Sequence, residues 1–350
     1  MFDTTYETAE EASWVVILPG PCSCKAHETL QENEKKRQSV EAIAEERHVN
    51  TFERQGDMLA PALLTRPSSP APVTPFHGEQ CYRCIRELSH TAGLLGPQYS
   101  HVYLAEDLAH PGQIVVLKQA KNDLPMRKAA LAQQFFVRER DILSTLTHPH
   151  ITHLRHTFED QDGTPTLVLD YIEGQTLEEL LFRRGGRVPV ALALYTGIQL
   201  CEILHYLHGQ SIIHCDLKPA NILLSDSGQT YLIDFGIAHY ALPHRTGTNQ
   251  RLGSYGYAAP EQYDKKGRIG PWTDLYSLGV LLHRMLSGDD PGQKPSDSLF
   301  TFPPLKNPEW VSINTLVTGL LQREPARRKP MSAALVQNKL EEVIYPYFQD

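Results

Sequence analysis

The 350-residue chain contains few cysteines, no excess of basic residues and no long uncharged apolar run. Six cysteines are too few to indicate a disulfide scaffold, so reduced thiols and a cytoplasmic location are expected. The formal net charge of -8 argues against nucleic acid as the main partner, because phosphate backbones favour a basic protein face. The apolar run at 14–18 ends at Pro19, far short of the ~20 residues that a membrane helix needs, and no membrane span is predicted elsewhere.

The N-terminal segment 1–81 differs in amino-acid composition from the rest of the chain. Residues 27–54 are rich in Glu, Gln, Lys and Arg and lack an apolar stripe wide enough to drive independent folding. The stretch that follows is interrupted by prolines among Ser, Ala and Thr, which is typical of a linker: Pro61, Pro67, Pro70, Pro72 and Pro75. The sequence therefore predicts a poorly structured extension over 1–81 and a folded domain over 82–350.

Cysteines in this segment raise the question of a zinc site. Cys22, Cys24 and His27 lie close together, and Cys81 and Cys84 lie at the start of the predicted domain. The spacing is poor for a tetrahedral zinc cluster, and Cys84 falls in what should be the first strand of the domain. Free thiols are therefore preferred over a metal site.

The predicted domain changes from strand-like to helix-like patterns along its length. Short β-like runs at 102–105, 114–117 and 167–169 surround one helical stretch at about 126–146. Beyond residue 176 helical patterns dominate. A strand-rich half followed by a helix-rich half predicts an α+β fold of two lobes, at 82–170 and 171–350, with a ligand cleft between them.

The densest group of chemically active residues lies in the second lobe, at 214–221 and 234–236. Phosphoryl transfer from ATP needs metal ions and cationic charge on the phosphates, and an acceptor oxygen held in line. Carboxylate and amide oxygens on two neighbouring loops suit Mg²⁺. A further carboxylate can take the acceptor proton, and a lysine two residues later can contact the γ-phosphate.

These residues resemble the protein-kinase catalytic loop, His-Arg-Asp-x-Lys-x-x-Asn followed by Asp-Phe-Gly, with one substitution. Other markers of that family stand on both sides of this loop, in the order in which the family has them: Lys118, Glu139, Ala259-Pro260-Glu261 and Arg328. Residues 256–263 are similar to bacterial, eukaryotic-like members of the family. The resemblance extends from about Tyr82 almost to the end of the chain and implies the two-lobed protein-kinase fold.

The resemblance also implies ATP and Mg²⁺ as cofactors and a role for each matching residue. Lys118 would hold the α- and β-phosphates, with Glu139 as its ion-pair partner. Asp216 would orient the acceptor hydroxyl and take its proton, next to Lys218 on the γ-phosphate. The two residues expected to bind Mg²⁺ are Asn221 and Asp234.

The expected adenine contacts come from the same resemblance. Apolar side chains would sandwich the base, the backbone of 170–172 would hydrogen-bond its edge, and Leu169 would act as gatekeeper. The residues implied in this contact are Val102, Val116, Leu169, Asp170, Ile172 and Leu223.

Two residues bear on the substrate class. Lys218 has the form seen in serine/threonine kinases, and Ser254 stands at the usual threonine position before Ala-Pro-Glu. The resemblance therefore implies protein substrates with Ser or Thr acceptors. Thr246 and Thr248 are candidate autophosphorylation sites.

The phosphate-covering loop departs from the family pattern. Counting back from Val102, the glycine positions of G-x-G-x-x-G-x-V fall on Leu95, Pro97 and Ser100, and only Gly96 survives, one place out of register. Proline cannot donate an amide to a phosphate. Each lost charged hydrogen bond costs about 1.5–3 kcal/mol, which predicts weaker ATP binding rather than an inactive enzyme.

Cys215 stands where the family usually carries an arginine that meets a phosphate on the activation loop. A cysteine cannot form that clamp by charge, so activity should depend less on loop phosphorylation. A small buried side chain is the preferred interpretation of Cys215, ahead of a redox role.

Two other functions remain open. A pseudokinase that binds nucleotide as a scaffold or switch is favoured by the altered glycine loop and opposed by the intact catalytic residues. A kinase fold that phosphorylates a small molecule is opposed by residues 254–261, which resemble a peptide-docking loop. The substrate, the activating signal and the oligomeric state are not given by the sequence.

Overall fold

The computed structural model describes residues 76–77, 81–88, 99–121, 124–159, 163–240, 253–296, 298 and 300–344. Nearly all of the predicted N-terminal extension lies outside these residues, with Cys22, Cys24 and His27. Gly96 of the phosphate-covering loop and the two candidate autophosphorylation sites also lie outside them.

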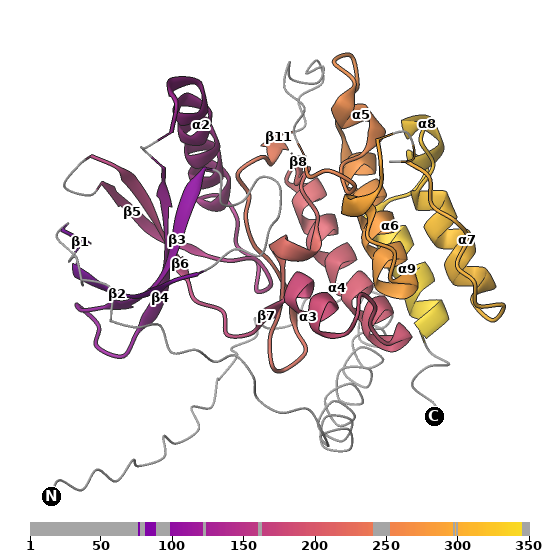
Figure 1. Cartoon of the computed structure of the whole chain (residues 1–350), viewed down its shortest axis with the longest axis horizontal. Helices are drawn as coiled ribbons and strands as arrows, with labels where there is room; N and C mark the ends of the chain where they lie inside the picture. The colour runs from indigo at the N-terminus through magenta and orange to yellow at the C-terminus, as the bar shows by residue number, and fades with distance from the viewer. Residues whose placement is uncertain are drawn as a thin grey trace, which may run out of the picture.

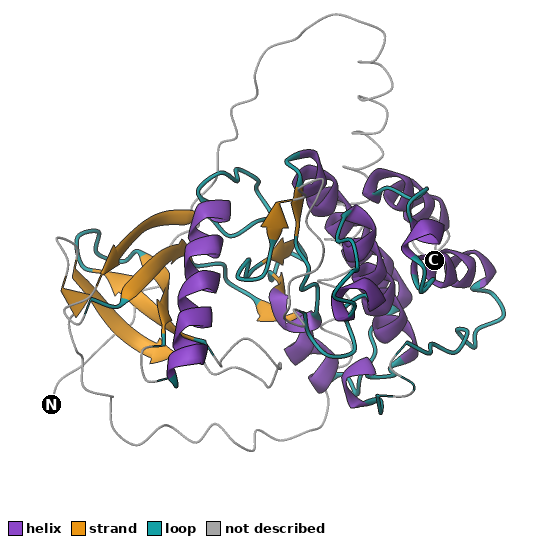
Figure 2. Cartoon of the chain, turned by 90° about the horizontal axis from the view of Figure 1, so that it is seen from above, coloured by secondary structure: helices purple, strands orange, loops and turns teal. Residues whose placement is uncertain are grey.

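The first lobe is built on a six-stranded antiparallel sheet in the order β1-β2-β3-β4-β6-β5 (Figure 1). Its one long helix, α2, stands beside the sheet on the side that faces the second lobe (Figure 2). The elements are β1 (Phe76–His77), β2 (Cys81–Glu87), β3 (Ser100–Asp107), β4 (Ile114–Ala120), α2 (Met126–Leu143), β5 (Leu154–Glu159) and β6 (Pro165–Asp170).

Strand β4 shows how the sheet aims functional side chains. Val115 and Leu117 are fully buried in an apolar cluster with Tyr82 and Val168. Because successive residues of a strand point to opposite faces, Val116 and Lys118 share the other face, which lines the cleft between the lobes.

The second lobe is mainly helical, and the predicted change from strands to helices is confirmed (Figure 1). Its strands are short: β7 (Gln175–Thr176), β8 (Ile212–Ile213), β9 (Ile222–Leu224), β10 (Thr230–Leu232) and β11 (His239–Tyr240). Its α-helices are α3 (Leu177–Arg183), α4 (Val190–Gly209), α5 (Pro260–Tyr263), α6 (Pro271–Ser287), α7 (Val311–Leu320), α8 (Pro325–Arg328) and α9 (Ala333–Ile344).

Helix α4 corrects one expectation from composition. It is long and apolar enough to cross a membrane, and no other helix in the described ranges meets both conditions. The expectation that no segment would qualify was therefore wrong. Within this fold, 61% of its apolar window is buried, and the helix packs against α6 and α9. Its buried side chains belong to the main core cluster, so the fold itself accounts for its apolar character.

Helix α6 is fixed at both ends, which matters because it carries a residue of the site. Pro271 occupies the first helical turn, where its missing amide hydrogen is not needed. Gly288 ends the helix in a left-handed conformation with φ of 85°, a geometry that glycine adopts without strain.

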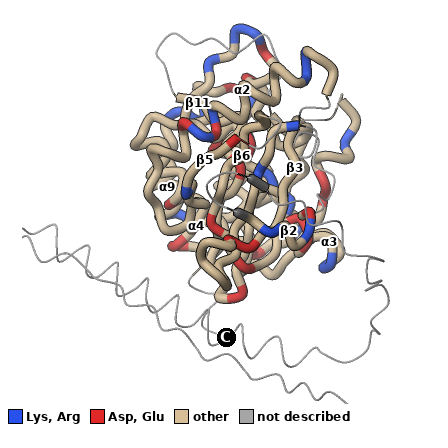
Figure 3. The backbone as a smooth tube through the Cα atoms, turned by 90° about the vertical axis from the view of Figure 1, so that its left-hand side faces the viewer, with Lys and Arg blue, Asp and Glu red and all other residues tan. Residues whose placement is uncertain are grey.

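Acidic and basic residues are interspersed along the described chain (Figure 3). The view into the sheet lobe in that figure shows no continuous basic stripe over the described residues. The negative net charge of the sequence is therefore not offset by one concentrated basic face on this side.

Candidate active site

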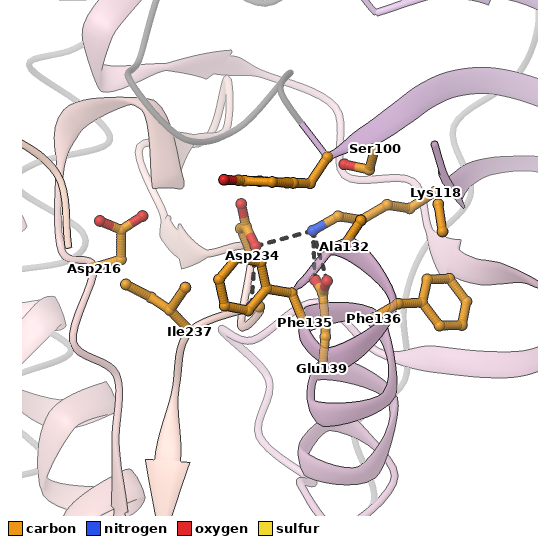
Figure 4. A pocket seen from close by; sticks show the side chains of 12 residues that line it. Ser100, Lys118, Ala132, Phe135, Phe136, Glu139, Asp216, Asp234 and Ile237 are labelled. Atoms are coloured by element: carbon orange, nitrogen blue, oxygen red, sulfur yellow. Dashed lines mark hydrogen bonds and ion pairs between the residues drawn. The ribbon is translucent and has the colours of Figure 1, made fainter. Parts of the chain in front are cut away.

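A three-residue ion-pair network joins the two lobes at the cleft (Figure 4). Lys118 Nζ, from β4, lies 2.8 Å from Oε1 and 2.6 Å from Oε2 of Glu139 on α2. The same ammonium lies 2.9 Å from Oδ1 of Asp234, on the loop after β10. The expected partnership of Lys118 with Glu139 is thus present, and Asp234 joins it.

The electrostatics of this network favour a charged Lys118 and a charged Asp234, while burial raises the pKa of Glu139. Burial alone would lower the pKa of Lys118, but the nearby carboxylates of Asp234 and Glu139 outweigh it and raise that pKa above its ordinary value. Burial would likewise raise the pKa of Asp234, but Lys118 and Lys218 hold it well below the usual range. Lys118 is therefore cationic and Asp234 anionic at neutral pH.

Asp216 is surrounded by hydrogen-bond donors. Its Oδ1 accepts from the amide and the hydroxyl of Ser254, at 3.0 and 2.7 Å. Its Oδ2 lies 2.9 Å from Lys218 Nζ and 3.1 Å from Asn221 Nδ2. Because every contact donates to the carboxylate, these contacts fix its orientation.

The backbone of the catalytic loop is held by Asp274, which is completely buried on α6. Its carboxylate accepts from the amides of His214 at 3.0 Å and Cys215 at 2.8 Å. It also lies 2.9 Å from Nε2 of His208. This anchoring role of Asp274 is not among the expectations from the sequence.

Two residues of the site have left-handed backbone conformations that side chains other than glycine rarely adopt. Cys215 has φ of 66° and Asp234 has φ of 71°. Such conformations persist only where the surroundings enforce them. At Cys215 the enforcing contacts are Asp274 on its amide and Gln262 Nε2, which donates to its carbonyl at 2.8 Å.

A buried ion pair anchors residues 259–261 in the helical lobe. Arg328 Nη2 lies 2.5 Å from both oxygens of Glu261, and both side chains are almost fully buried. Thr273 Oγ1 donates to Glu261 Oε1 at 2.9 Å. The expected pairing of Glu261 with Arg328 is therefore present, and it ties residues 259–261 to α6 and α8.

The cleft contains a cavity of about 290 Å³, near the lower end of the ~300–1,000 Å³ typical of small-molecule pockets. All six residues expected to contact adenine line it, together with Lys118, Glu139, Lys218, Asn221 and Asp234. Asp216 lies at the adjoining cavity beneath the end of the phosphate-covering loop. The adenine residues in the lining are Val102, Val116, Leu169, Asp170, Ile172 and Leu223.

One backbone group of the expected adenine contact is already used within the protein. The Asp170 amide donates to the His153 carbonyl at 3.0 Å. The Asp170 side chain is turned to Arg155, whose Nε lies 2.5 Å from Oδ1. The amide of Asp170 is therefore not available to the edge of an adenine, which leaves the other backbone groups of 170–172 for the expected contact.

The register assigned to the phosphate-covering loop stays a prediction, because Leu95, Gly96 and Pro97 lie outside the described residues. Before the loop, strand β2 ends at Glu87, and the Leu88 amide donates to the Val102 carbonyl at 2.8 Å. Ser100, the third assigned position, begins β3 and lines the cavity.

The two expected metal-binding residues fit Mg²⁺ by the chemistry of their remaining donor atoms. Asp234 Oδ1 accepts from Lys118 and from the Gly236 amide at 3.1 Å, so Oδ2 is the atom for a metal. Asn221 turns its Nδ2 to Asp216, so its amide oxygen would be the second ligand. Two hard oxygen ligands suit Mg²⁺, which keeps several waters and binds substrate phosphates.

Zinc receives no support from the part of the chain that the structure describes. No group of three or more His, Cys, Asp or Glu residues that could hold a metal occurs there. Cys84, on β2, has a free thiol. The other cysteines of the suspected cluster lie outside the residues whose side chains are described.

Comparison with known proteins places this geometry in context. The sequence model of the protein kinase domain matches residues 93–338. The chain is 36% identical over 185 residues to "Serine/threonine-protein kinase PkaA" of Streptomyces coelicolor, covering 52% of this chain and 33% of that protein. It is 34% identical over 221 residues to "Serine/threonine-protein kinase AtPK1/AtPK6" of Arabidopsis thaliana, covering 62% and 46%. It is 35% identical over 222 residues to "cAMP-dependent protein kinase type 3" of Saccharomyces cerevisiae, covering 61% and 52%. The chain thus spans about a third to a half of the length of these curated relatives.

Proposed function

The chain belongs to the protein kinase domain family, and from that premise we propose that it transfers the γ-phosphate of Mg-ATP to Ser or Thr hydroxyls of protein substrates. The observation that carries this proposal is the set of donors around the Asp216 carboxylate, beside the assembled network of Lys118, Glu139 and Asp234. Both parts of the machinery are in place at one cleft.

The cationic and metal-binding residues act on the phosphates. Lys118, kept charged by its two carboxylate neighbours, contacts the α- and β-phosphates. Asn221 and Asp234 are the residues that would hold Mg²⁺ through oxygen atoms. When bound, the ion would neutralise charge on the phosphates and orient the γ-phosphoryl group.

Asp216 acts on the acceptor. Its carboxylate orients the Ser or Thr hydroxyl and accepts its proton while the hydroxyl oxygen bonds to the γ-phosphorus. The bond between that phosphorus and the β,γ-bridging oxygen breaks, and ADP leaves. Lys218, 2.9 Å from Asp216, contacts the γ-phosphate during transfer. Catalysis therefore rests on positioning and charge rather than on a covalent intermediate.

The acceptor class rests on two residues and on the relatives. Lys218 and Ser254 both contact Asp216, so the groups that indicate an aliphatic hydroxyl acceptor surround the proposed base. Two of the relatives reported above are named as serine/threonine kinases. Residues 254–261, anchored by the Glu261–Arg328 pair, form the segment expected to dock a peptide. A protein substrate is therefore favoured over a small molecule.

We place the start of the kinase domain at Tyr82. This side chain is fully buried in the sheet lobe, and its hydroxyl lies 2.8 Å from His156 Nε2. Its strand pairs with β3 along most of its length. A domain that began after β2 would lose this part of its core.

A pseudokinase is the second candidate function, and the phosphate-covering loop is the observation that favours it. The loop lacks glycine at the assigned positions. In that case the cleft would bind nucleotide without transferring phosphate, and the protein would act as a switch or scaffold.

Transfer of label from γ-labelled ATP decides between the two. Wild type is incubated with Mg²⁺ and a generic Ser/Thr protein substrate, next to Asp216→Asn and the matched control Asp226→Asn. Asp226 is exposed in the turn after β9 and lies outside the site. Label on Ser or Thr with wild type and Asp226→Asn, and a rate about 10²–10⁴-fold lower with Asp216→Asn, supports the kinase. No label with any variant, with ATP binding measured separately, overturns it in favour of the pseudokinase.

A further inference from the structure

A small apolar cluster lies beneath the catalytic loop, apart from the main core. Its buried members are Phe135, Ile213, Cys215 and Ile237, and Tyr99, Leu131 and Ile269 pack against them. We call these seven residues the Cys215 cluster. They come from the end of the phosphate-covering loop, from α2, from the catalytic loop, from the segment after Asp234 and from the approach to α6.

The cluster occupies the position where the family's arginine would place a charge. Cys215 is only 2% exposed, and Ile213 is completely buried. Burial, together with the nearby carboxylates of Asp274 and Asp216, keeps the pKa of the Cys215 thiol well above its usual value. The thiol is therefore neutral and the cluster that packs around it is apolar, while the charge of Arg138, also on α2, acts on the thiol in the opposite direction to the carboxylates.

Tyr99 connects the Cys215 cluster to the phosphate end of the cleft. Its ring meets Phe135 edge to face, with ring centroids 5.3 Å apart at an angle of 80°. Its carbonyl accepts the Lys121 amide at 2.9 Å, which fixes the end of the loop against the sheet. Tyr99 also lines the same cavity as Lys118, Asp216 and Asp234.

Phe135 connects the Cys215 cluster to the ion pair between Lys118 and Glu139. Phe135 and Glu139 are four residues apart on α2, so they lie on the same face of the helix. Figure 4 shows both side chains projecting from α2 towards Asp234 and Ile237. A rotation or shift of α2 that removes Phe135 from the Cys215 cluster therefore also moves Glu139 away from Lys118.

Granting the kinase activity proposed above, we propose that Phe135 and Tyr99 are positioning residues that hold α2 where Glu139 pairs with Lys118. The other residues of the Cys215 cluster support them through packing, so this placement of α2 needs no phosphate on the activation segment. The pair of aromatic rings also links the phosphate-covering loop to α2, which couples nucleotide contact to the placement of Glu139.

The test compares Phe135→Ala and Tyr99→Ala with two controls. Tyr99→Phe keeps the ring and removes only the hydroxyl. Leu143→Ala truncates another buried side chain of α2, one that packs into the main core instead of the Cys215 cluster. Each protein is treated with phosphatase and its folded fraction is measured by circular dichroism. If Phe135→Ala does not fold, Phe135→Leu takes its place.

Two readouts separate positioning from general stability. The first is hydrogen exchange of the α2 amides without nucleotide, and the second is kcat and KM for ATP per mole of folded protein. Phe135→Ala and Tyr99→Ala should speed α2 exchange and lower kcat by up to about 10²-fold, the cost of misplacing a positioned group by about 1 Å. Wild type should keep its kcat after phosphatase treatment, and Tyr99→Phe should match wild type. The double variant should lose less than the product of the two single losses, because the rings act as one contact.

Three results would overturn the inference: α2 exchange and kcat in Phe135→Ala equal to those of Leu143→Ala, a Tyr99→Phe loss as large as that of Tyr99→Ala, or loss of wild-type activity on phosphatase treatment. Exchange is measured without phosphate transfer. A wild type that transfers no phosphate would therefore refute the proposed kinase activity, while α2 exchange alone would still decide whether the cluster holds the helix.

Discussion

The Cys215 amide lies 2.8 Å from Oδ1 of Asp274, a contact between the catalytic loop and a carboxylate buried in the middle of the helical lobe. The same carboxylate binds the His214 amide, so two successive backbone groups of the loop are fixed to one side chain. The left-handed conformation of Cys215 is the backbone shape that this double contact enforces.

Asp274→Asn should destabilise the protein and slow phosphate transfer. An amide keeps one acceptor oxygen, so at least one charged hydrogen bond is lost, at about 1.5–3 kcal/mol. Urea unfolding measures the loss in unfolding free energy. The exposed Asp289→Asn is the control and should stay within about 0.5 kcal/mol of wild type. An Asp274→Asn protein as stable as this control would contradict the anchoring role.

Arg328→Gln should be strongly destabilising. It leaves the buried Glu261 carboxylate without its partner, and breaking a buried ion pair costs about 3–5 kcal/mol. Arg327→Gln is a matched control from the adjacent position, because Arg327 is 64% exposed and pairs with the exposed Glu324. This control should cost no more than about 1 kcal/mol. Equal shifts in the two chemical unfolding curves would argue against a structural role for the buried pair.

Ser254→Ala should lower the rate of phosphate transfer. The variant removes the hydroxyl that donates to Asp216 Oδ1 at 2.7 Å while keeping the amide contact at 3.0 Å. A lost hydrogen bond to a charged group, about 1.5–3 kcal/mol, corresponds to roughly 10–150-fold in kcat. Ser254→Thr retains the hydroxyl and should recover most of the activity. A Thr variant as slow as the Ala variant would show that the hydroxyl is not what matters.

Stability should fall when the pH drops below about 6.5, partly because of His283. Burial lowers the pKa of this histidine, although its contact with the Pro303 carbonyl opposes the shift. Its folded-state pKa thus lies below the unfolded value of ~6.5, so the unfolded chain binds more protons between the two values. Stability is present above this window and is lost as the pH falls through it, by at most about 1.4 kcal/mol per pH unit.

His283→Gln tests this assignment. Urea unfolding at pH 7.5 and pH 5.5 should show a smaller pH difference for this variant than for wild type. His205→Gln, at an exposed position of α4, should leave the difference unchanged. An unchanged pH difference in His283→Gln would remove this histidine from the explanation.

Local motifs predicted much of the site because kinase chemistry is concentrated in short runs of sequence. Asp216, Lys218 and Asn221 lie within one loop, and Lys218 and Asn221 both contact the Asp216 carboxylate. The pairing of Lys118 with Glu139 was predicted by resemblance alone, since nothing in the spacing of a strand and a helix fixes a 2.6 Å contact.

Long-range contacts explain what was missed. The role of Asp274 depends on a contact between residues 59 positions apart, which leaves no local pattern. Helix α4 has the length and composition of a membrane helix. A buried core helix shares both properties, so composition alone does not separate the two kinds of helix.

The contact of Lys118 with Asp234 has a consequence for the sequence of events during turnover. The two residues belong to opposite lobes, so their ion pair ties the lobes together while the cleft holds no nucleotide. The phosphates of an arriving nucleotide would compete with Asp234 for the Lys118 ammonium, and a metal ion would take up the Asp234 carboxylate. We therefore expect the ion pair to open when Mg-ATP binds and to form again once ADP has left.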